Sequence, residues 1–223
     1  MKYVNYEKTV VVVANDVNIS IFKPWWLIKN NIIREEEIIG DVIVSPIAVS
    51  IPTAEFGLGV FPNRIQMAFH LHSTNIQENI NRVAGQIVGK LPHTPYTGIG
   101  LNFNYFISPE QKEFCVWDRM HFASEFAKKI VSNQEMKPKY GSYFSFDMLG
   151  GRLKVDAKPV IANESITSIN PEWARGKDLV GVNFNFHYDI NVQEDSVDKI
   201  IGVLNLWTEA QRKSEEIINQ LTD

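Results

Sequence analysis

The chain has 223 residues, of which 44% are hydrophobic and 22% are charged, a balance that is typical of folded proteins and argues against wholesale disorder. Its 22 basic and 26 acidic residues give a net charge of −4, so no broad positive field is available to bind nucleic acid. The single cysteine, Cys115, excludes an internal disulfide and a cysteine-based metal cluster.

The first segment, residues 1–52, is expected to add one or two strands and the Pro24-Trp25-Trp26 sequence to the fold. Its apolar run, Val10 to Val13, is too short for the core of a signal peptide. Elsewhere no stretch approaches the roughly 18 uncharged apolar residues that a membrane span requires. We therefore expect a cytoplasmic protein that does not interact with membranes.

Two hairpins of the same pattern are predicted, at residues 56–67 and at residues 144–155, which start 88 residues apart. Each has an alternating strand, a two-residue turn at Pro62-Asn63 or Gly150-Gly151, and a second alternating strand. The second strand of the first hairpin is expected to continue to Ser73. A helix follows it, because apolar side chains recur there at helical spacing, namely Ile76, Ile80, Val83 and Ile87.

A further pair of strands is predicted at residues 98–107 and 181–190, which are identical at five of ten positions without a gap. Each strand is followed by a predicted helix. The first helix is expected to start with Ser108 as its cap and to run to about residue 130. The second covers residues 195–221 and, at 1.5 Å per residue, would be about 40 Å long.

These elements predict an α+β fold, in which an antiparallel sheet has helices packed mainly on one face. The sheet is expected to consist of two similar halves, each with a hairpin, a connection, a strand and a helix, and to end in the long C-terminal helix. The halves cover residues 53–132 and 140–223, and residues 1–52 join the first half in one compact domain. Chance similarity is the alternative explanation, because alternation alone makes amphipathic strands look alike.

The twin strands predict one apolar and one polar face of the sheet, because alternate residues of a strand point the same way. The apolar side chains lie between Ile99 and Ile107 and between Val182 and Ile190, and they are expected to face the helices. The opposite, open face is a candidate binding surface that carries Asn102, Asn104, Asn183, Asn185, His187 and Asp189. Solvation of a half-exposed sheet produces the same pattern.

Two histidines at positions i and i+2 of a strand can reach one metal ion, which makes His70 and His72 a candidate pair. His187 and Asp189 repeat this spacing, so four ligands are available if the two pairs meet. This is the alternative hypothesis of a metal-assisted hydrolase. Nothing in the spacing itself brings the pairs together.

The helix after residue 108 provides a second candidate surface. Its otherwise polar side carries three aromatic rings that would mark a partner-binding face if they are exposed: Phe114, Trp117 and His121. Alternatively, residues 1–52 fold back over these rings, with Trp25 and Trp26 as the cover. Cys115 falls on the opposite, apolar arc of the helix, where a thiol usually serves only packing.

The sequence contains no catalytic motif and no nucleotide-binding loop, so no catalytic residue is assigned and no cofactor is expected. Arg152, Lys154 and Lys158 share a strand face with Asp156, which favours solvated edge charge over a nucleic-acid footprint. The leading hypothesis is a non-catalytic binding protein that engages a protein partner or a second copy of itself through the open sheet face or the aromatic helix face. A pocket for an apolar small molecule, between helices and sheet, is a further alternative.

Overall fold

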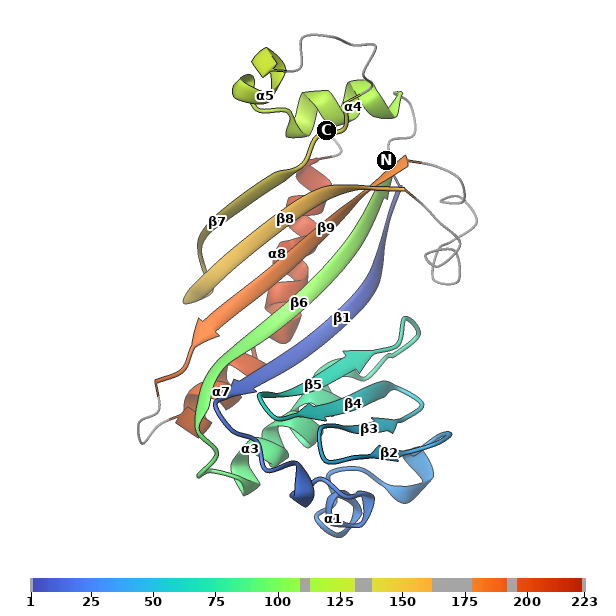
Figure 1. Cartoon of the computed structure of the whole chain (residues 1–223), viewed down its shortest axis with the longest axis vertical. Coiled ribbons are helices and arrows are strands. Elements are labelled where there is room, and N and C mark those ends of the chain that lie inside the picture. Colours follow the sequence, from blue (N-terminus) through green and yellow to red (C-terminus); the bar gives the residue numbers. More distant parts are fainter. Residues whose placement is uncertain (1, 109–112, 131–137, 162–177, 192–195, 222–223) are drawn as a thin grey trace.

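The computed structural model describes residues 2–108, 113–130, 138–161, 178–191 and 196–221. The strands are β1 (Lys2–Ala14), β2 (Ile43–Val44), β3 (Val49–Pro52), β4 (Phe56–Phe61), β5 (Arg64–Phe69), β6 (Tyr96–Ser108), β7 (Ser142–Met148), β8 (Gly151–Ile161) and β9 (Asp178–Asp189). They form one nine-stranded antiparallel sheet in the order β2-β3-β4-β5-β1-β6-β9-β8-β7 (Figure 1). The predicted antiparallel sheet and α+β class are thus confirmed.

The helical elements are short. They are η1 (Ile19–Ile21), α1 (Pro24–Lys29), η2 (Glu35–Glu37), α2 (Ile76–Ile80), η3 (Asn81–Gly85), α3 (Gln86–Lys90), α4 (Phe114–Phe122), α5 (Glu125–Ile130), α7 (Ser196–Leu204) and α8 (Trp207–Gln220). The segment from α2 to α3 is the helix that the sequence predicted, with a π turn, η3, in its middle. Among the described residues, no helix is long and apolar enough to cross a membrane.

Burial alternates along most of β9, as the sequence predicted, whereas most of β6 is buried on both faces. The ten alternating side chains that the sequence predicted as apolar, from Ile99 to Ile107 and from Val182 to Ile190, are all buried. They point to the side of the sheet on which α8 lies, and Figure 1 shows α8 running behind β9 and β6. The opposite face of these strands, which we call the open face, carries the polar residues and, near one end, a small buried cluster around Phe106 and Leu179.

Helix α8 is anchored on the sheet at two places. At its start, the Trp207 ring packs between Phe69 and Phe103, with ring centroids 5.5 and 4.6 Å away. Further along, the hydroxyl groups of Tyr105 and Ser214 form a hydrogen bond of 2.8 Å. Burial raises the pKa of Tyr105 to about 12, so the phenol stays neutral inside this interface.

The prediction of one long C-terminal helix is wrong, because α7 ends at Leu204 and α8 begins at Trp207. At the break the Leu206 N–H donates to the carbonyl three residues earlier, that of Val203, and not four residues earlier as in an α-helix. The Leu204 carbonyl instead accepts a hydrogen bond of 3.0 Å from the Gln77 side chain. The break lets α7 pack on the α2 to α3 segment while α8 packs on the sheet. One straight helix would not reach both.

Three smaller predictions also need correction. Ser108 is the last residue of β6 and not a helix cap, and helix α4 begins at Phe114; Pro109 lies outside the described residues. The second hairpin turns at Leu149-Gly150, one residue earlier than expected, because these two residues adopt φ of 54° and 75°, as a type I′ turn requires. Strand β5 ends at Phe69, before the two histidines.

The order of the strands differs between the two predicted halves. In the second half β8 pairs directly with β9, whereas in the first half β1 lies between β5 and β6. Strand β1 therefore occupies the place where the first hairpin would otherwise pair with β6. The predicted connection between the second hairpin and β9 falls mostly on residues 162–177, which lie outside the described residues.

Candidate functional site

Amide side chains on the open face form hydrogen-bonded rows that cross the strands. In one row Asn185 on β9 donates to Asn102 on β6, whose own amide group donates to the Thr9 hydroxyl on β1 at 3.1 Å. The row forms because Asn102 lies directly opposite both Asn185 and Thr9 in the ladder. Thr9 is 5% exposed, so the row ends in the protein and not in water.

The neighbouring row ends in a carboxylate. Asn183 donates to Asn104, and the Asn104 amide donates to Glu7 Oε2 at 2.6 Å. Asn104 is only 9% exposed. Four of the predicted binding residues therefore bond one another and β1, so each of them already uses part of its hydrogen-bonding capacity within the protein. We call these two lines of side chains the amide rows.

The open face has a hollow at one corner, where the β7–β8 turn, the end of β9 and the start of α7 meet. This hollow, the end pocket, has a volume of about 620 Å³. Its acidic and basic side chains come from four elements: Asp147, Arg152, His187, Asp189 and Lys199. The sequence predicted His187 and Asp189 as site residues, and the structure brings them together with Arg152 and Lys199.

Two of the three basic groups of the end pocket have a carboxylate partner. His187 Nε2 lies 3.1 Å from Asp189 Oδ1, and Arg152 Nη1 donates to Asp147 Oδ1 at 3.0 Å. The Lys199 ammonium donates to the backbone carbonyl of Asp189 at 2.8 Å, and no described carboxylate pairs with it. Lys199 is therefore a cation of the pocket that forms no ion pair with a described residue.

Two glycines allow close packing around His187 and Tyr188, and one of them, Gly151, lines the end pocket. A Cβ atom on Gly98 would lie 3.4 Å from Cε1 of His187, so the imidazole rests against bare backbone. A Cβ atom on Gly151 would lie 2.6 Å from the Tyr188 ring and 2.8 Å from the His187 carbonyl, which leaves no room for a side chain. Glycine inside a strand often marks such a close approach, and this signal could have revealed both positions in the sequence.

Arg152 also reaches over the edge strand β7. Its Nε donates to the Ser145 hydroxyl at 2.7 Å, and its Nη2 donates to the Ser145 backbone carbonyl at 3.0 Å. With its bond to Asp147, the guanidinium is held in one orientation beside the pocket. The sequence indicated only a solvated edge charge at this position, because the reach of one side chain across a strand leaves no periodic signal.

The structure does not bring the two histidine pairs together. The ladder places His187 opposite Gly100, then Val11, then Gln66 on β5, which is three strand spacings or about 14 Å away. His70 lies four residues beyond Gln66, about another 14 Å, so the pairs are about 20 Å apart.

The first pair is also engaged locally. The rings of His70 and His72 stack, and their Nε2 atoms lie 3.0 and 3.2 Å from the backbone carbonyls of Thr53 and Ala54. Among the described residues, no group of three or more histidine, cysteine or acidic side chains is placed to hold a metal ion. A shared metal site at His70, His72, His187 and Asp189 is not compatible with this geometry.

The predicted aromatic face of the helix is turned inward. Trp117 is 4% exposed and packs against Phe114 and Phe122. The exposed apolar side chains of α4 lie on the opposite arc, where Val116 and Met120 are 48% and 60% exposed, and Cys115 is exposed with them. The expectation of an exposed surface formed by Phe114, Trp117 and His121 is therefore wrong for its central residue, and so is the expectation that Cys115 is buried.

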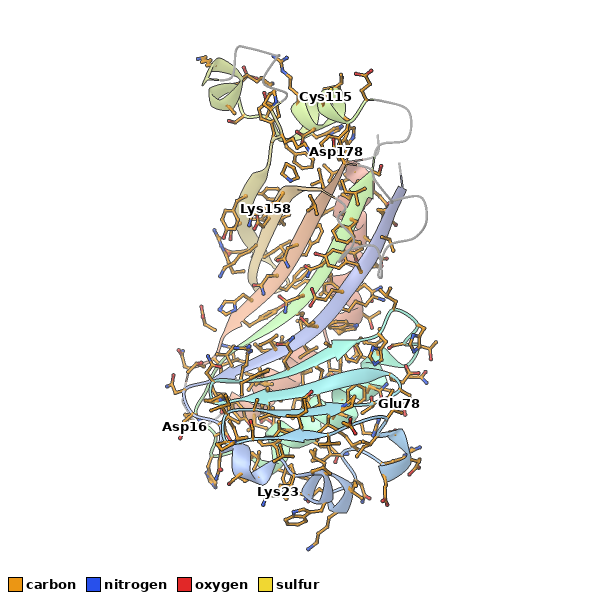
Figure 2. All side chains as sticks on the ribbon, turned by 45° about the vertical axis from the view of Figure 1, so that its right-hand side comes forward. Asp16, Lys23, Glu78, Cys115, Lys158 and Asp178 are labelled. Atoms are coloured by element: carbon orange, nitrogen blue, oxygen red, sulfur yellow. The ribbon has the colours of Figure 1, made fainter. Side chains whose placement is uncertain are left out.

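The reason for this inversion is a buried acid. Asp118 is fully buried, and its Oδ2 accepts a hydrogen bond of 2.6 Å from the backbone N–H of Tyr140. The polar-looking side of the helix is thus the inner side: a backbone group 22 residues away binds one carboxylate oxygen of Asp118, and the other oxygen, Oδ1, is buried without a hydrogen-bond partner. The alternative cover is also excluded, since Lys23, beside Trp25 and Trp26, lies at the opposite end of the molecule from Cys115 (Figure 2).

Comparisons with known proteins do not assign this site. No family model matches the chain, and no curated protein matches it significantly. The function is therefore inferred from the residues themselves.

Proposed function

We propose that the chain is a non-catalytic binding protein and that the end pocket is its binding site. The observation that supports this proposal is the meeting of Arg152, His187 and Lys199, from β8, β9 and α7, around one cavity. The rest of the open face is less suited to a ligand, because the amide rows already bond one another.

The ligand is expected to carry an acidic group. Lys199 bonds only a backbone carbonyl among its described neighbours, so an incoming carboxylate gains a charge pair that the free protein lacks. Asp147 and Asp189 hold the other two basic side chains, Arg152 and His187, in place beside the pocket. A small dicarboxylate or an acidic side chain of a partner protein has the required chemistry.

A titration with succinate tests the proposal. Saturable shifts of the backbone amide signals of Gly98, Gly150 and His187 in a ¹H–¹⁵N correlation spectrum are expected. Lys199→Gln should weaken the affinity about fivefold, which corresponds to one partly exposed charge pair of about 1 kcal/mol. Lys158→Gln is the matched control, because Lys158 lies on the same face, pairs with Asp156 and does not line the pocket. Equal affinity of the Lys199→Gln variant and the wild type would contradict the proposal.

The proposal does not extend to the metal-assisted hydrolase. That reaction required the two histidine pairs to share an ion, and about 20 Å separates them. The pocket for an apolar small molecule is likewise not part of the proposal, because charged side chains from four elements line the end pocket.

A protein partner or self-association stays a prediction, with a changed location. Exposed Val116 and Met120 support a contact on the outer arc of α4, and not on the aromatic side that the sequence favoured. Size-exclusion chromatography with light scattering tests self-association, and a monomer at every concentration up to the millimolar range would contradict it. The cytoplasmic location and the lack of nucleic-acid binding are kept as parts of the same proposal.

We also propose that the two halves arose by duplication. The 83-residue offset between the twin strands maps Asn102 onto Asn185, and these two residues lie directly opposite each other in the β6–β9 ladder. The local two-fold axis that relates β6 to β9 therefore superimposes the same residues that the sequence repeat aligns. The insertion of β1 beside β6 is then a later difference between the halves.

A further inference from the structure

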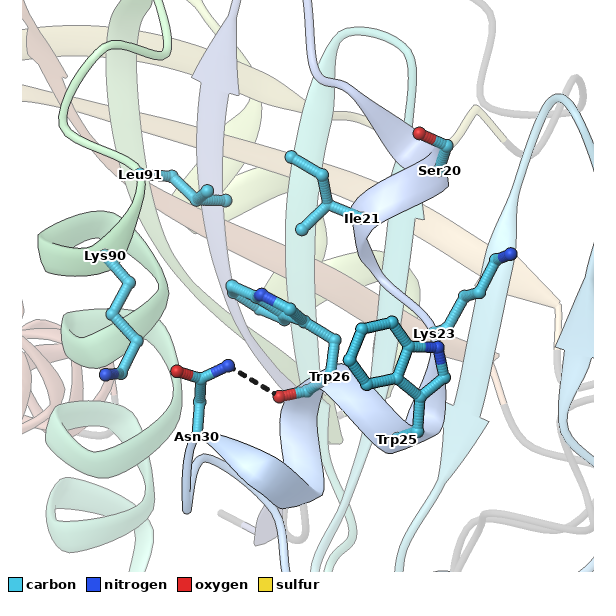
Figure 3. A pocket seen from close by; sticks show the side chains of 8 residues that line it. All are labelled: Ser20, Ile21, Lys23, Trp25, Trp26, Asn30, Lys90 and Leu91. Atoms are coloured by element: carbon cyan, nitrogen blue, oxygen red, sulfur yellow. Dashed lines mark hydrogen bonds between the residues drawn. The ribbon is translucent and has the colours of Figure 1, made fainter.

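A second cavity, the tryptophan pocket, lies far from the end pocket, between α1 and the end of α3 (Figure 3). Its volume is about 490 Å³. The lining side chains that matter here are Ile21, Lys23, Trp25, Trp26, Asn30 and Lys90. None of them was assigned a role from the sequence, where Trp25 and Trp26 were expected only as a cover for another helix.

The two indoles of the pocket differ in how firmly they are held: Trp26 is packed against the protein, whereas Trp25 faces water. Trp26 is half-buried and packs edge to face on Phe22, with ring centroids 5.7 Å apart, and Phe22 is fully buried. The Asn30 side chain donates to the Trp26 carbonyl at 2.8 Å and fixes the end of the helix. Trp25 is 59% exposed, so a large indole surface faces water beside the fixed one.

Two positive charges flank the indoles. Lys23 precedes α1 and Lys90 ends α3, and in Figure 3 Lys90 extends on the Asn30 side of Trp26 while Lys23 extends beyond Trp25. Both side chains are exposed, and neither has an ion pair with any described residue. The pocket therefore combines two indole rings with two ammonium groups that no described carboxylate neutralises.

We propose that the tryptophan pocket binds an organic anion with a flat unsaturated ring. The ring stacks on the indoles, which bury its apolar faces, and the anionic group pairs with Lys90 or Lys23 at the rim. Trp25, exposed in the free protein, closes on the ring and loses its contact with water. This site is independent of the end pocket, which lacks an exposed aromatic wall and would take an acidic group without a ring.

The test compares two probes that share one ring system, 1-naphthoate and 1-naphthamide, on the full chain at low salt. Binding is followed by the indole N–H signals of Trp25 and Trp26, which the variants W25F and W26F assign. Saturable shifts of both signals are expected, with an affinity for the naphthoate at least about fivefold higher than for the naphthamide. Trp25→Ala should weaken both probes at least tenfold; this side chain is exposed, so the fold is retained.

Charge variants complete the test. The double variant with Lys23→Gln and Lys90→Gln should remove the preference for the naphthoate, whereas Lys29→Gln should keep it. Lys29 is an exposed lysine at the end of α1, and its side chain does not line the pocket. Lys199→Gln should leave the indole shifts unchanged, which separates this site from the end pocket. Equal binding of the two probes, a preference that survives the double variant, or shifts confined to other tryptophans would each overturn the proposal.

Discussion

Replacement of Asn104 by alanine tests whether the amide rows stabilise the sheet. Asn104 is 9% exposed, accepts a hydrogen bond from Asn183 and donates one of 2.6 Å to Glu7. The lost bond to Asn183 is worth about 1 kcal/mol and the lost bond to the carboxylate about 1.5–3 kcal/mol. Glu7 is exposed, so water replaces part of the second bond. We expect the free energy of unfolding to fall by about 2 kcal/mol.

Urea unfolding, followed by circular dichroism, measures this change. For a chain of this size a loss of about 2 kcal/mol also lowers Tm by about 4–8 °C. Asn102→Ala should cost less, about 1 kcal/mol, because it removes two neutral hydrogen bonds at a half-exposed position. Asn191→Ala is the matched control, since Asn191 is exposed beyond β9 and a change of less than about 0.5 kcal/mol is expected there.

The outcome decides between two roles of the same residues. If the free energy of unfolding of Asn104→Ala lies within about 0.5 kcal/mol of the wild-type value, the amide rows do not stabilise the sheet. The amides would then be available to a ligand, as the sequence first indicated. If the variant loses about 2 kcal/mol and still binds succinate, the rows support the sheet and the end pocket is the binding site.

Three further predictions concern stability. Burial raises the pKa of Asp118, so the folded chain favours the protonated carboxyl, and the stability that this protonation contributes is lost as the pH rises through the folded pKa. Asp118→Asn keeps an acceptor for Tyr140 but carries no charge. The urea midpoint of the variant should therefore exceed that of the wild type by more at pH 7 than at pH 4. An equal difference at both pH values would contradict this. Gly151→Ala should destabilise the fold by about 2 kcal/mol through its clash with Tyr188, whereas Gly57→Ala, with nothing within 4 Å of the new Cβ, should not lower the stability in thermal unfolding. Arg82 donates hydrogen bonds to the Ile32 carbonyl, Glu37 and Asn79 at 2.8–2.9 Å. Arg82→Lys should keep only part of these bonds, so amide hydrogen exchange in residues 32–38 should become faster. Unchanged exchange would show that Arg82 does not stabilise this segment.

The sequence predicted well those features that depend on neighbouring residues. Alternation located the buried face of β6 and β9, because the geometry of a strand alone determines which side chains share a face. Helical spacing likewise located the α2 to α3 segment. The turn at Leu149-Gly150 was missed by one residue, since a leucine at positive φ is uncommon and gives no local signal.

Features that depend on distant residues were missed. The inner side of α4 was misassigned because the partner of Asp118 is a backbone group of Tyr140, on the far side of a connection. The break before Trp207 depends on two different packing partners, Phe103 on the sheet and the α2 to α3 segment. For the same reason His187 and Asp189 were found, since they are two residues apart, whereas Lys199, which completes the end pocket from α7, was not.

The hydrogen bonds from Arg152 to Ser145 have a consequence for β7, one of the two edge strands of the sheet. The Leu149-Gly150 turn pairs Met148 with Gly151, so the peptide groups of β7 that face outward are those of Tyr143, Ser145 and Asp147. A tenth strand, donated by another molecule, would need the Ser145 carbonyl that the guanidinium already occupies. We therefore expect Arg152 to hinder the addition of a strand from another molecule at this edge, where the exposed Phe144 and Phe146 would otherwise favour amyloid-like growth.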